Sequence, residues 1–123
     1  MEDFVPFELA KKLEGLGFDE SSLFFYREDD EDKCVHCVDT NQPLIDAKIT
    51  IAPTISQVLK WLFDKKQLFV NIDCNICDKF GLFFTIYKKG EETWEACGFD
   101  DNYYNKPEEA TLAGIEYVLD NLI

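Results

Sequence analysis

Apolar residues recur every three or four positions in two stretches of the chain, which is the spacing of an amphipathic helix. The first stretch predicts a helix over residues 54–66, in which Thr54 and Gln57 form a capping box. The second predicts a helix that begins at Pro107, because proline suits a first helical turn. A shorter helix is expected over residues 6–14. The expected buried arcs of the two longer helices are Ile55, Val58, Leu59, Leu62 and Phe63, with Trp61 on the border, and Leu112, Ile115, Val118, Leu119 and Leu122.

Six further segments show the residue-by-residue alternation, or the aromatic and β-branched content, of strands. Two of them flank the acidic run Glu28 to Asp32, and this arrangement predicts a hairpin. In the third segment, alternation places Ile49 and Ile51 on a buried face and Thr50 on a wet one. The expected strands are residues 22–27, 33–39, 44–51, 68–73, 81–88 and 93–99.

The predicted elements follow the order helix, three strands, helix, three strands, helix. Leu68, Val70 and Ile72 share one side of their strand, which is expected to face the apolar arcs of the helices. Apolar residues make up 46% of the 123 residues, which is enough for one core. We therefore predict an α+β fold in a single domain, residues 1–123, with a largely antiparallel sheet and helices packed against it.

Negative charge runs through the whole chain, with 25 acids against 12 bases and a formal net charge of −13. Binding to nucleic acid needs clustered Lys and Arg, which displace counterions from phosphates. Both halves of this chain are acidic and Arg27 is its one arginine, so direct binding to nucleic acid is not expected. Such a charge ordinarily keeps a protein soluble, and the more specific interpretation is that it attracts a basic protein partner.

The location of the protein is suggested by its apolar runs and its first residues. No stretch approaches the roughly 18 apolar residues that a membrane span needs. The start, Met1-Glu2-Asp3, is acidic where a signal peptide is basic. We therefore expect a cytoplasmic protein without membrane contact, whose five cysteines are kept as thiols.

Two Cys-x-x-Cys pairs are the strongest chemical signal in the sequence. Four thiolates in such pairs can hold a structural zinc ion in tetrahedral geometry. In an extended strand, however, residues three apart lie about 10 Å apart and point to opposite faces, which argues against chelation by the first pair. The preferred interpretation is that these cysteines serve as small buried hydrophobic residues, and zinc binding is kept as an alternative. The candidate ligands are Cys34, Cys37, Cys74 and Cys77.

No coherent catalytic set is visible in the sequence. The six glycines are scattered without a phosphate-binding or nucleophile-elbow motif, and His36 is the single histidine. A non-enzymatic protein without a cofactor is therefore expected. Aromatic residues flanked by acids favour protein interfaces, and they predict a contact surface made of Trp61, Trp94, Asp100, Asp101, Tyr103 and Tyr104.

The second half carries a series of short motifs: Ala52-Pro53-Thr54, Gln57-Val58, Trp61-Leu62, Glu108-Glu109-Ala110, Gly114-Ile115, Leu119 and Leu122-Ile123. With these motifs the chain resembles a group of small uncharacterised proteins encoded by gut anaerobes and their phages, over most of residues 52–123. The motifs cap helices and fill cores, so the resemblance implies a fold and carries across no activity or site residue. The cysteine pairs and Phe63-Asp64 depart from the group's pattern.

The second half also resembles a double-stranded RNA-binding domain in its order of helix, three strands and helix. The last helix echoes that family at Ala110, Ala113, Ile115, Val118 and Leu119. That family grips phosphates with lysines at the start of this helix, where this chain has Glu108 and Glu109. The comparison implies similar topology without RNA binding.

Three functions remain open from the sequence. The preferred one is a small acidic module that binds another protein, because the core is complete without a metal. The second is a structural zinc protein. The third is an inhibitor that imitates DNA and occupies the basic cleft of a nucleic-acid-handling protein. Its carboxylates would come from the run Glu28 to Asp32, from Asp100 and Asp101, and from the helical stripe Glu109, Glu116 and Asp120.

Overall fold

A computed structural model describes residues 3–20, 23–28, 31–37, 48–75, 81–99 and 103–123. Within these residues it contains three α-helices and two three-stranded antiparallel sheets, in the predicted order. The α+β prediction is therefore confirmed. The elements are α1 (Phe7–Gly15), β1 (Phe24–Arg27), β2 (Val35–Cys37), β3 (Ile49–Ile51), α2 (Ile55–Trp61), the π-helical turn η1 (Leu62–Lys66), β4 (Leu68–Asn75), β5 (Gly81–Lys89), β6 (Trp94–Phe99) and α3 (Pro107–Asn121).

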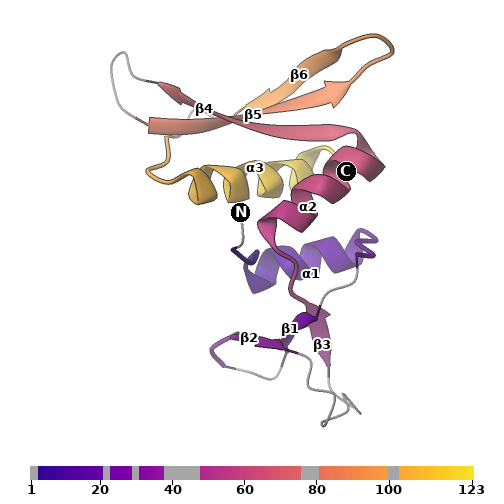
Figure 1. The fold of residues 1–123 in the computed structure, drawn as a ribbon, viewed down its shortest axis with the longest axis vertical. Coiled ribbons are helices and arrows are strands. Elements are labelled where there is room, and N and C mark those ends of the chain that lie inside the picture. The colour runs from indigo at the N-terminus through magenta and orange to yellow at the C-terminus, as the bar shows by residue number, and fades with distance from the viewer. Residues whose placement is uncertain (1–2, 21–22, 29–30, 38–47, 76–80, 100–102) are drawn as a thin grey trace.

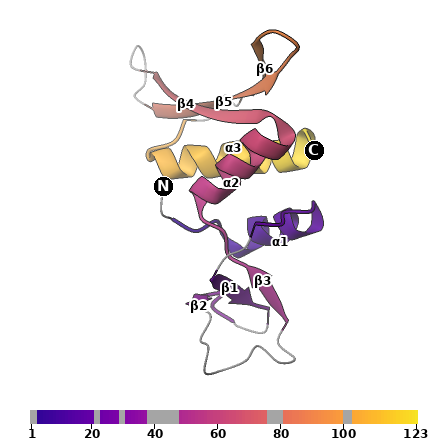
Figure 2. The same ribbon diagram turned by 45° about the vertical axis from the view of Figure 1, so that its right-hand side comes forward.

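The elements stack in layers. Figure 1 shows the larger sheet, of order β4-β5-β6, at the top, with α3 and α2 beneath it, then α1, and the smaller sheet, of order β2-β1-β3, at the bottom. The turned view in Figure 2 keeps the same succession. Helices α2 and α3 thus lie on one face of the larger sheet, and no helix in the described part of the chain covers its other face.

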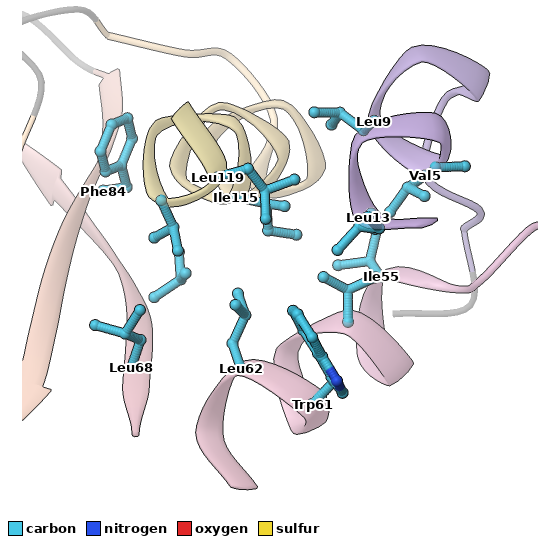
Figure 3. Packing of buried hydrophobic residues seen from close by; sticks show 14 of the residues in the cluster. Val5, Leu9, Leu13, Ile55, Trp61, Leu62, Leu68, Phe84, Ile115 and Leu119 are labelled. Carbon is cyan, nitrogen blue, oxygen red and sulfur yellow. The ribbon is translucent and has the colours of Figure 1, made fainter. Parts of the chain in front are cut away.

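One core joins these layers. Figure 3 shows side chains of α1, α2, α3 and the larger sheet meeting between the helices. Leu68 and Val70 are buried on the inner side of β4, as predicted, with Ile72 packed beside them. Because α3 lies between the sheet and the other helices, its buried surface is wider than one stripe. It comprises Ala110, Thr111, Gly114, Ile115, Val118 and Leu119, while Leu112 and Leu122 are partly buried.

Helix α2 begins where the sequence predicts. Thr54 Oγ1 accepts the Gln57 backbone N–H at 3.2 Å, and Gln57 Oε1 accepts the Thr54 N–H at 2.9 Å, so the capping box is confirmed. After Trp61 the helix widens into the π-helical turn η1, which ends at Gln67 in the left-handed conformation.

The buried face of α2 differs from the predicted arc. Trp61 is only 3% exposed and meets the edge of Phe18, with ring centroids 5.4 Å apart, whereas Phe63 is 49% exposed. The prediction that Phe63 is buried and Trp61 borders the core is therefore wrong. Trp61 follows Val58 by three residues and so shares its face, and this turns Phe63 out of the core.

The smaller sheet confirms the predicted hairpin, since β1 pairs with β2, but it reverses the faces of β3. Thr50 is buried and Ile51 is 37% exposed. Thr50 is the partner of Tyr26, whose ring meets the edge of Phe7, so both residues face α1. The prediction of a wet Thr50 and a buried Ile51 is wrong because α1 covers the opposite face. Residues 44–47 of the predicted strand lie outside the described residues.

Candidate protein-docking face

The outer face of the larger sheet is set by the pleat of its strands. Side chains alternate along a strand, so the inward Leu68 and Val70 require an outward Phe69 between them. The register carries this parity across the sheet, because Phe69 pairs with Tyr87 and Tyr87 pairs with Ala96. The outward residues of the described sheet away from its masked ends are Phe69, Asn71, Asp73, Phe83, Thr85, Tyr87, Lys89, Trp94 and Ala96.

These nine positions are rich in aromatic residues and poor in acids. Phe69, Phe83, Tyr87 and Trp94 are aromatic, and Asp73 is the one carboxylate among them. Acids make up 25 of the 123 residues of the chain, so their scarcity on this face contrasts with the rest of the sequence. Enrichment in aromatics with depletion of charge is the compositional mark of the centre of a protein interface.

Four rings assemble at one end of this face, and we call Phe63, Phe69, Tyr87 and Trp94 the aromatic cluster. Phe63 and Trp94 stack, with centroids 5.3 Å apart and planes inclined by 20°. Phe69 stands nearly perpendicular to both, at 6.4 Å from Phe63 and 6.5 Å from Trp94. The four residues line a hollow of about 410 Å³. The turn η1 supplies Phe63, so the cluster draws on three strands and the end of a helix.

Three rings of the aromatic cluster, those of Phe63, Phe69 and Trp94, are exposed although they contact one another. Phe69 is 45% exposed and Trp94 is 37% exposed. Full burial of a large apolar side chain is favourable by about 1.5–3 kcal/mol, and much of that gain is still unrealised here. The rings therefore form a preassembled apolar surface that a partner can cover with little ordering of side chains.

A second aromatic pair lies at the other end of β5. Tyr103 meets Phe83 edge to face, with centroids 6.3 Å apart. The next residue, Tyr104, exchanges backbone hydrogen bonds of 2.9 and 2.8 Å with Leu82. Gly81 permits this approach, because a Cβ atom there would lie 2.5 Å from Tyr103 Cβ. Tyr103 is exposed and extends the aromatic character of the outer face.

The predicted contact residues divide into three groups. Trp94 and Tyr103 are exposed on or beside the outer face. Trp61 is buried, so its assignment to a contact surface is wrong, and Tyr104 packs against the core. Asp100 and Asp101 lie outside the described residues. The prediction missed Phe63, Phe69 and Tyr87, and of these Phe69 was marked in the sequence by its position between Leu68 and Val70.

The candidate zinc ligands that the structure describes are not all brought together. Cys37 belongs to β2 of the smaller sheet, and Cys34 directly precedes that strand. Cys74 belongs to β4 of the larger sheet, and the two sheets lie at opposite ends of the molecule (Figure 1). Among the described residues, no group of three His, Cys, Asp or Glu side chains could hold a metal ion. A single ion bound by all four cysteines is therefore not formed in this arrangement. Cys77 lies outside the described residues.

The cysteines also differ from the preferred interpretation of the sequence. Cys34, Cys37, Cys74 and Cys97 are all exposed, so these four are not buried core residues. At Cys97, partial burial of the thiol raises its pKa, which the nearby Lys88 ammonium opposes.

Part of the acidic stripe is already engaged inside the molecule. Lys12 Nζ of α1 lies 3.0 Å from Asp120 Oδ1 and 3.8 Å from Glu116 Oε1, and these contacts tie α1 to α3. In the run before β2, Lys11 pairs with Glu28 and lowers the pKa of that carboxyl. Glu109 is exposed, while Asp29, Asp30, Asp100 and Asp101 lie outside the described residues.

The described helices include none that is long and apolar enough to cross a membrane. Comparison of the chain with protein-family models, curated proteins and solved structures found no significant match.

Proposed function

We propose that this protein is a non-enzymatic module that binds another protein through the outer face of its larger sheet, centred on the aromatic cluster. The observation that carries the proposal is the preassembly of Phe63, Phe69 and Trp94 on a sheet face that no described helix covers. Buried aromatic residues provide much of the energy of protein interfaces, and these rings are placed to become buried.

The distribution of charge supports a protein partner. A chain with a net charge of −13 pays a desolvation penalty wherever a partner covers its carboxylates. On the outer face that penalty is small, since Asp73 is the one acid among the nine outward positions and lies away from the aromatic cluster. Acids elsewhere on the surface can still attract a basic partner over a distance of about one Debye length.

A comparison of variants tests the proposal. Phe69→Ser removes the ring that stands across Phe63 and Trp94, and it leaves the core intact because Phe69 points outward. Leu23→Ser is the matched control, since Leu23 is 67% exposed and directly precedes β1 of the smaller sheet. Proteins retained from a native cell extract by the original chain and by Leu23→Ser should be lost with Phe69→Ser.

Loss of binding is informative only if the variant is folded, so the unfolding transition of each variant is measured as well. Equal retention by Phe69→Ser and Leu23→Ser contradicts the proposed docking face. Catalytic turnover of any substrate that survives Phe69→Ser contradicts a purely binding role.

A further inference from the structure

Strand β6 is an open edge of the larger sheet. The strand order β4-β5-β6 leaves it paired with β5 alone, and Trp94, Glu95, Ala96 and Cys97 are all exposed. Among the described residues, the backbone hydrogen bonds found outside helices and strands include none to residues 94–97. An edge of this kind can accept an extended segment of another chain through main-chain hydrogen bonds.

The register identifies which backbone groups of β6 point outward. At the turn, Gly90 N–H donates to Thr93 O at 2.7 Å, and Lys89 N–H donates away from β6 to Gln67 O at 3.1 Å. Antiparallel pairs alternate between hydrogen-bonded and non-hydrogen-bonded, so Glu95 is hydrogen-bonded to Lys88 of β5. The backbone groups of Trp94 and Ala96 therefore point away from the sheet, toward solvent.

We propose that the partner adds an extended segment to the edge of β6, and that this segment alternates bulky apolar residues with Lys or Arg. This inference rests on the proposed function. The main chain of the segment pairs with Trp94 and Ala96. The extra residue at Cys97, where the register shifts, ends the regular edge. Pairing is therefore short, and the side chains of the segment must supply much of the affinity.

The outer face of the sheet explains why every second residue of the segment should be apolar. Ala96 lies between Tyr87 of β5 and the open edge, on the same face as Trp94. Its side chain is a single methyl group beside Tyr87, which lines the hollow of the aromatic cluster. A bulky apolar side chain in the added strand, placed next to Ala96, can extend over this methyl group and cover the exposed Trp94 ring.

The inner face of the sheet explains why the other residues of the segment should be Lys or Arg. Glu95 pairs with Lys88 and points to the inner side, and Glu91 and Glu92 are exposed in the turn before β6. None of the ion pairs found among the described residues involves these three carboxylates. A Lys or Arg placed beside Glu95 in the added strand forms a favourable cross-strand pair.

The same carboxylates disfavour a second copy of this chain as the occupant. Antiparallel pairing of β6 with β6 of another molecule, with Trp94 opposite Ala96, would place two copies of Glu95 directly opposite each other. Like charges across strands are destabilising, and each molecule carries a net charge of −13. The edge therefore selects a different, basic chain.

Selection from a phage-displayed library of random short peptides supplies the probe. The selected peptides should show apolar residues at one parity and Lys or Arg at the other. Amide hydrogen exchange of the full chain then reports the contact. Trp94 and Ala96 amides should become protected when the selected peptide binds, whereas Glu95, already bonded to β5, should change little.

Ala96→Pro tests the same contact by substitution. Proline is tolerated where the N–H of an edge strand faces solvent, so the sheet is kept and the outward donor is lost. We expect binding of the selected peptide to weaken about tenfold or more, in line with loss of a hydrogen bond and its steric fit. Ala96→Ser keeps the N–H, so it should weaken peptide binding much less than Ala96→Pro does.

Strand addition is overturned if no peptide is selected, if the selected peptides lack the alternation, or if the Trp94 and Ala96 amides stay unprotected. Equal peptide binding by folded Ala96→Pro also overturns it, and the exchange measurement decides if that variant does not fold. Partner capture that depends on Phe69 but not on the Ala96 N–H leaves the docking face valid and rejects strand addition alone.

Discussion

Gly114 of α3 lies directly against Val70 of β4, where a Cβ atom added to the glycine would come within 2.7 Å of Val70 Cγ1. Phe84 of β5 is the next neighbour, at 3.2 Å from the same position. Helix α3 can approach the larger sheet this closely only because the crossing residue has no side chain. The contact fixes the inner face of the sheet on α3 and leaves the aromatic face outward.

Gly114→Ala should therefore destabilise the protein, although alanine is the better helix former. Overpacking of a core typically costs about 1–3 kcal/mol, and urea titration measures the loss. Gly15→Ala is the control, since a Cβ atom at Gly15 of α1 meets nothing within 4 Å. That variant should keep its stability or gain up to about 1 kcal/mol. Equal effects of the two substitutions would show that α3 and the sheet are not in close contact.

Tyr26 should stabilise the junction between the smaller sheet and the segment before α1. Its buried hydroxyl donates to Val5 O at 2.6 Å. Tyr26→Phe leaves that carbonyl without this donor, and the free energy of unfolding should fall by about 1–2 kcal/mol. Tyr87→Phe, on the outer face, is the matched control and should change stability by less than about 0.5 kcal/mol. A loss as large in the control contradicts a specific role of the Tyr26 hydroxyl.

Tyr26 should also make the stability of the protein depend on pH. Burial raises the pKa of Tyr26 above its ordinary value. Above the unfolded pKa of about 10, the unfolded chain loses the proton while the folded protein still holds it. The stabilisation is fully present below that pH and is lost as the pH rises through the folded pKa. Denaturant titrations across this range should show a steeper alkaline loss for the original chain than for Tyr26→Phe, and parallel curves would contradict the assignment.

The sequence predicts those parts of the fold that depend on neighbouring residues. Thr54 and Gln57 are three positions apart, so their capping box can be inferred without knowing the fold, and the alternation of Leu68, Val70 and Ile72 identifies the inner side of β4. The faces of β3 could not be inferred, because Thr50 is buried by its pairing with Tyr26 and by α1. That choice depends on tertiary packing.

The aromatic cluster could likewise be predicted only in part from neighbouring residues. The outward direction of Phe69 follows from the pattern of its own strand. The stacking of Phe63 on Trp94 joins residues far apart in the sequence, and it depends on Phe63 lying outside the core because Trp61 occupies the buried face instead. Periodicity treats such a residue as buried, so the centre of the candidate site could not be found from the sequence.

The capping box should be measurable as stability. Thr54→Ala removes the acceptor of the Gln57 N–H and leaves an unsatisfied donor at the start of α2. Loss of such a cap typically costs about 1 kcal/mol, which chemical denaturation can measure. Thr93→Ala is the control, because Thr93 contacts Gly90 through its backbone carbonyl and is exposed. No difference between the variants would mean that the cap contributes nothing to the folded state.

The separation of the cysteine pairs predicts how the protein responds to zinc. Cys37 lies on β2, Cys34 directly precedes that strand, and Cys74 lies on β4, with the helical layers between the two sheets (Figure 1). One ion cannot bond to thiolates at both ends, because Zn–S bonds are about 2.3 Å long. Native mass spectrometry of the purified chain should therefore show no zinc that depends on both pairs. Zinc or a chelator should also leave the unfolding transition unchanged. The contrary outcome is a stoichiometric zinc adduct that stabilises the fold and is abolished separately by Cys34→Ser and by Cys74→Ser. Since folding and metal binding are coupled when ligands converge, that result would require the two sheets to be rearranged.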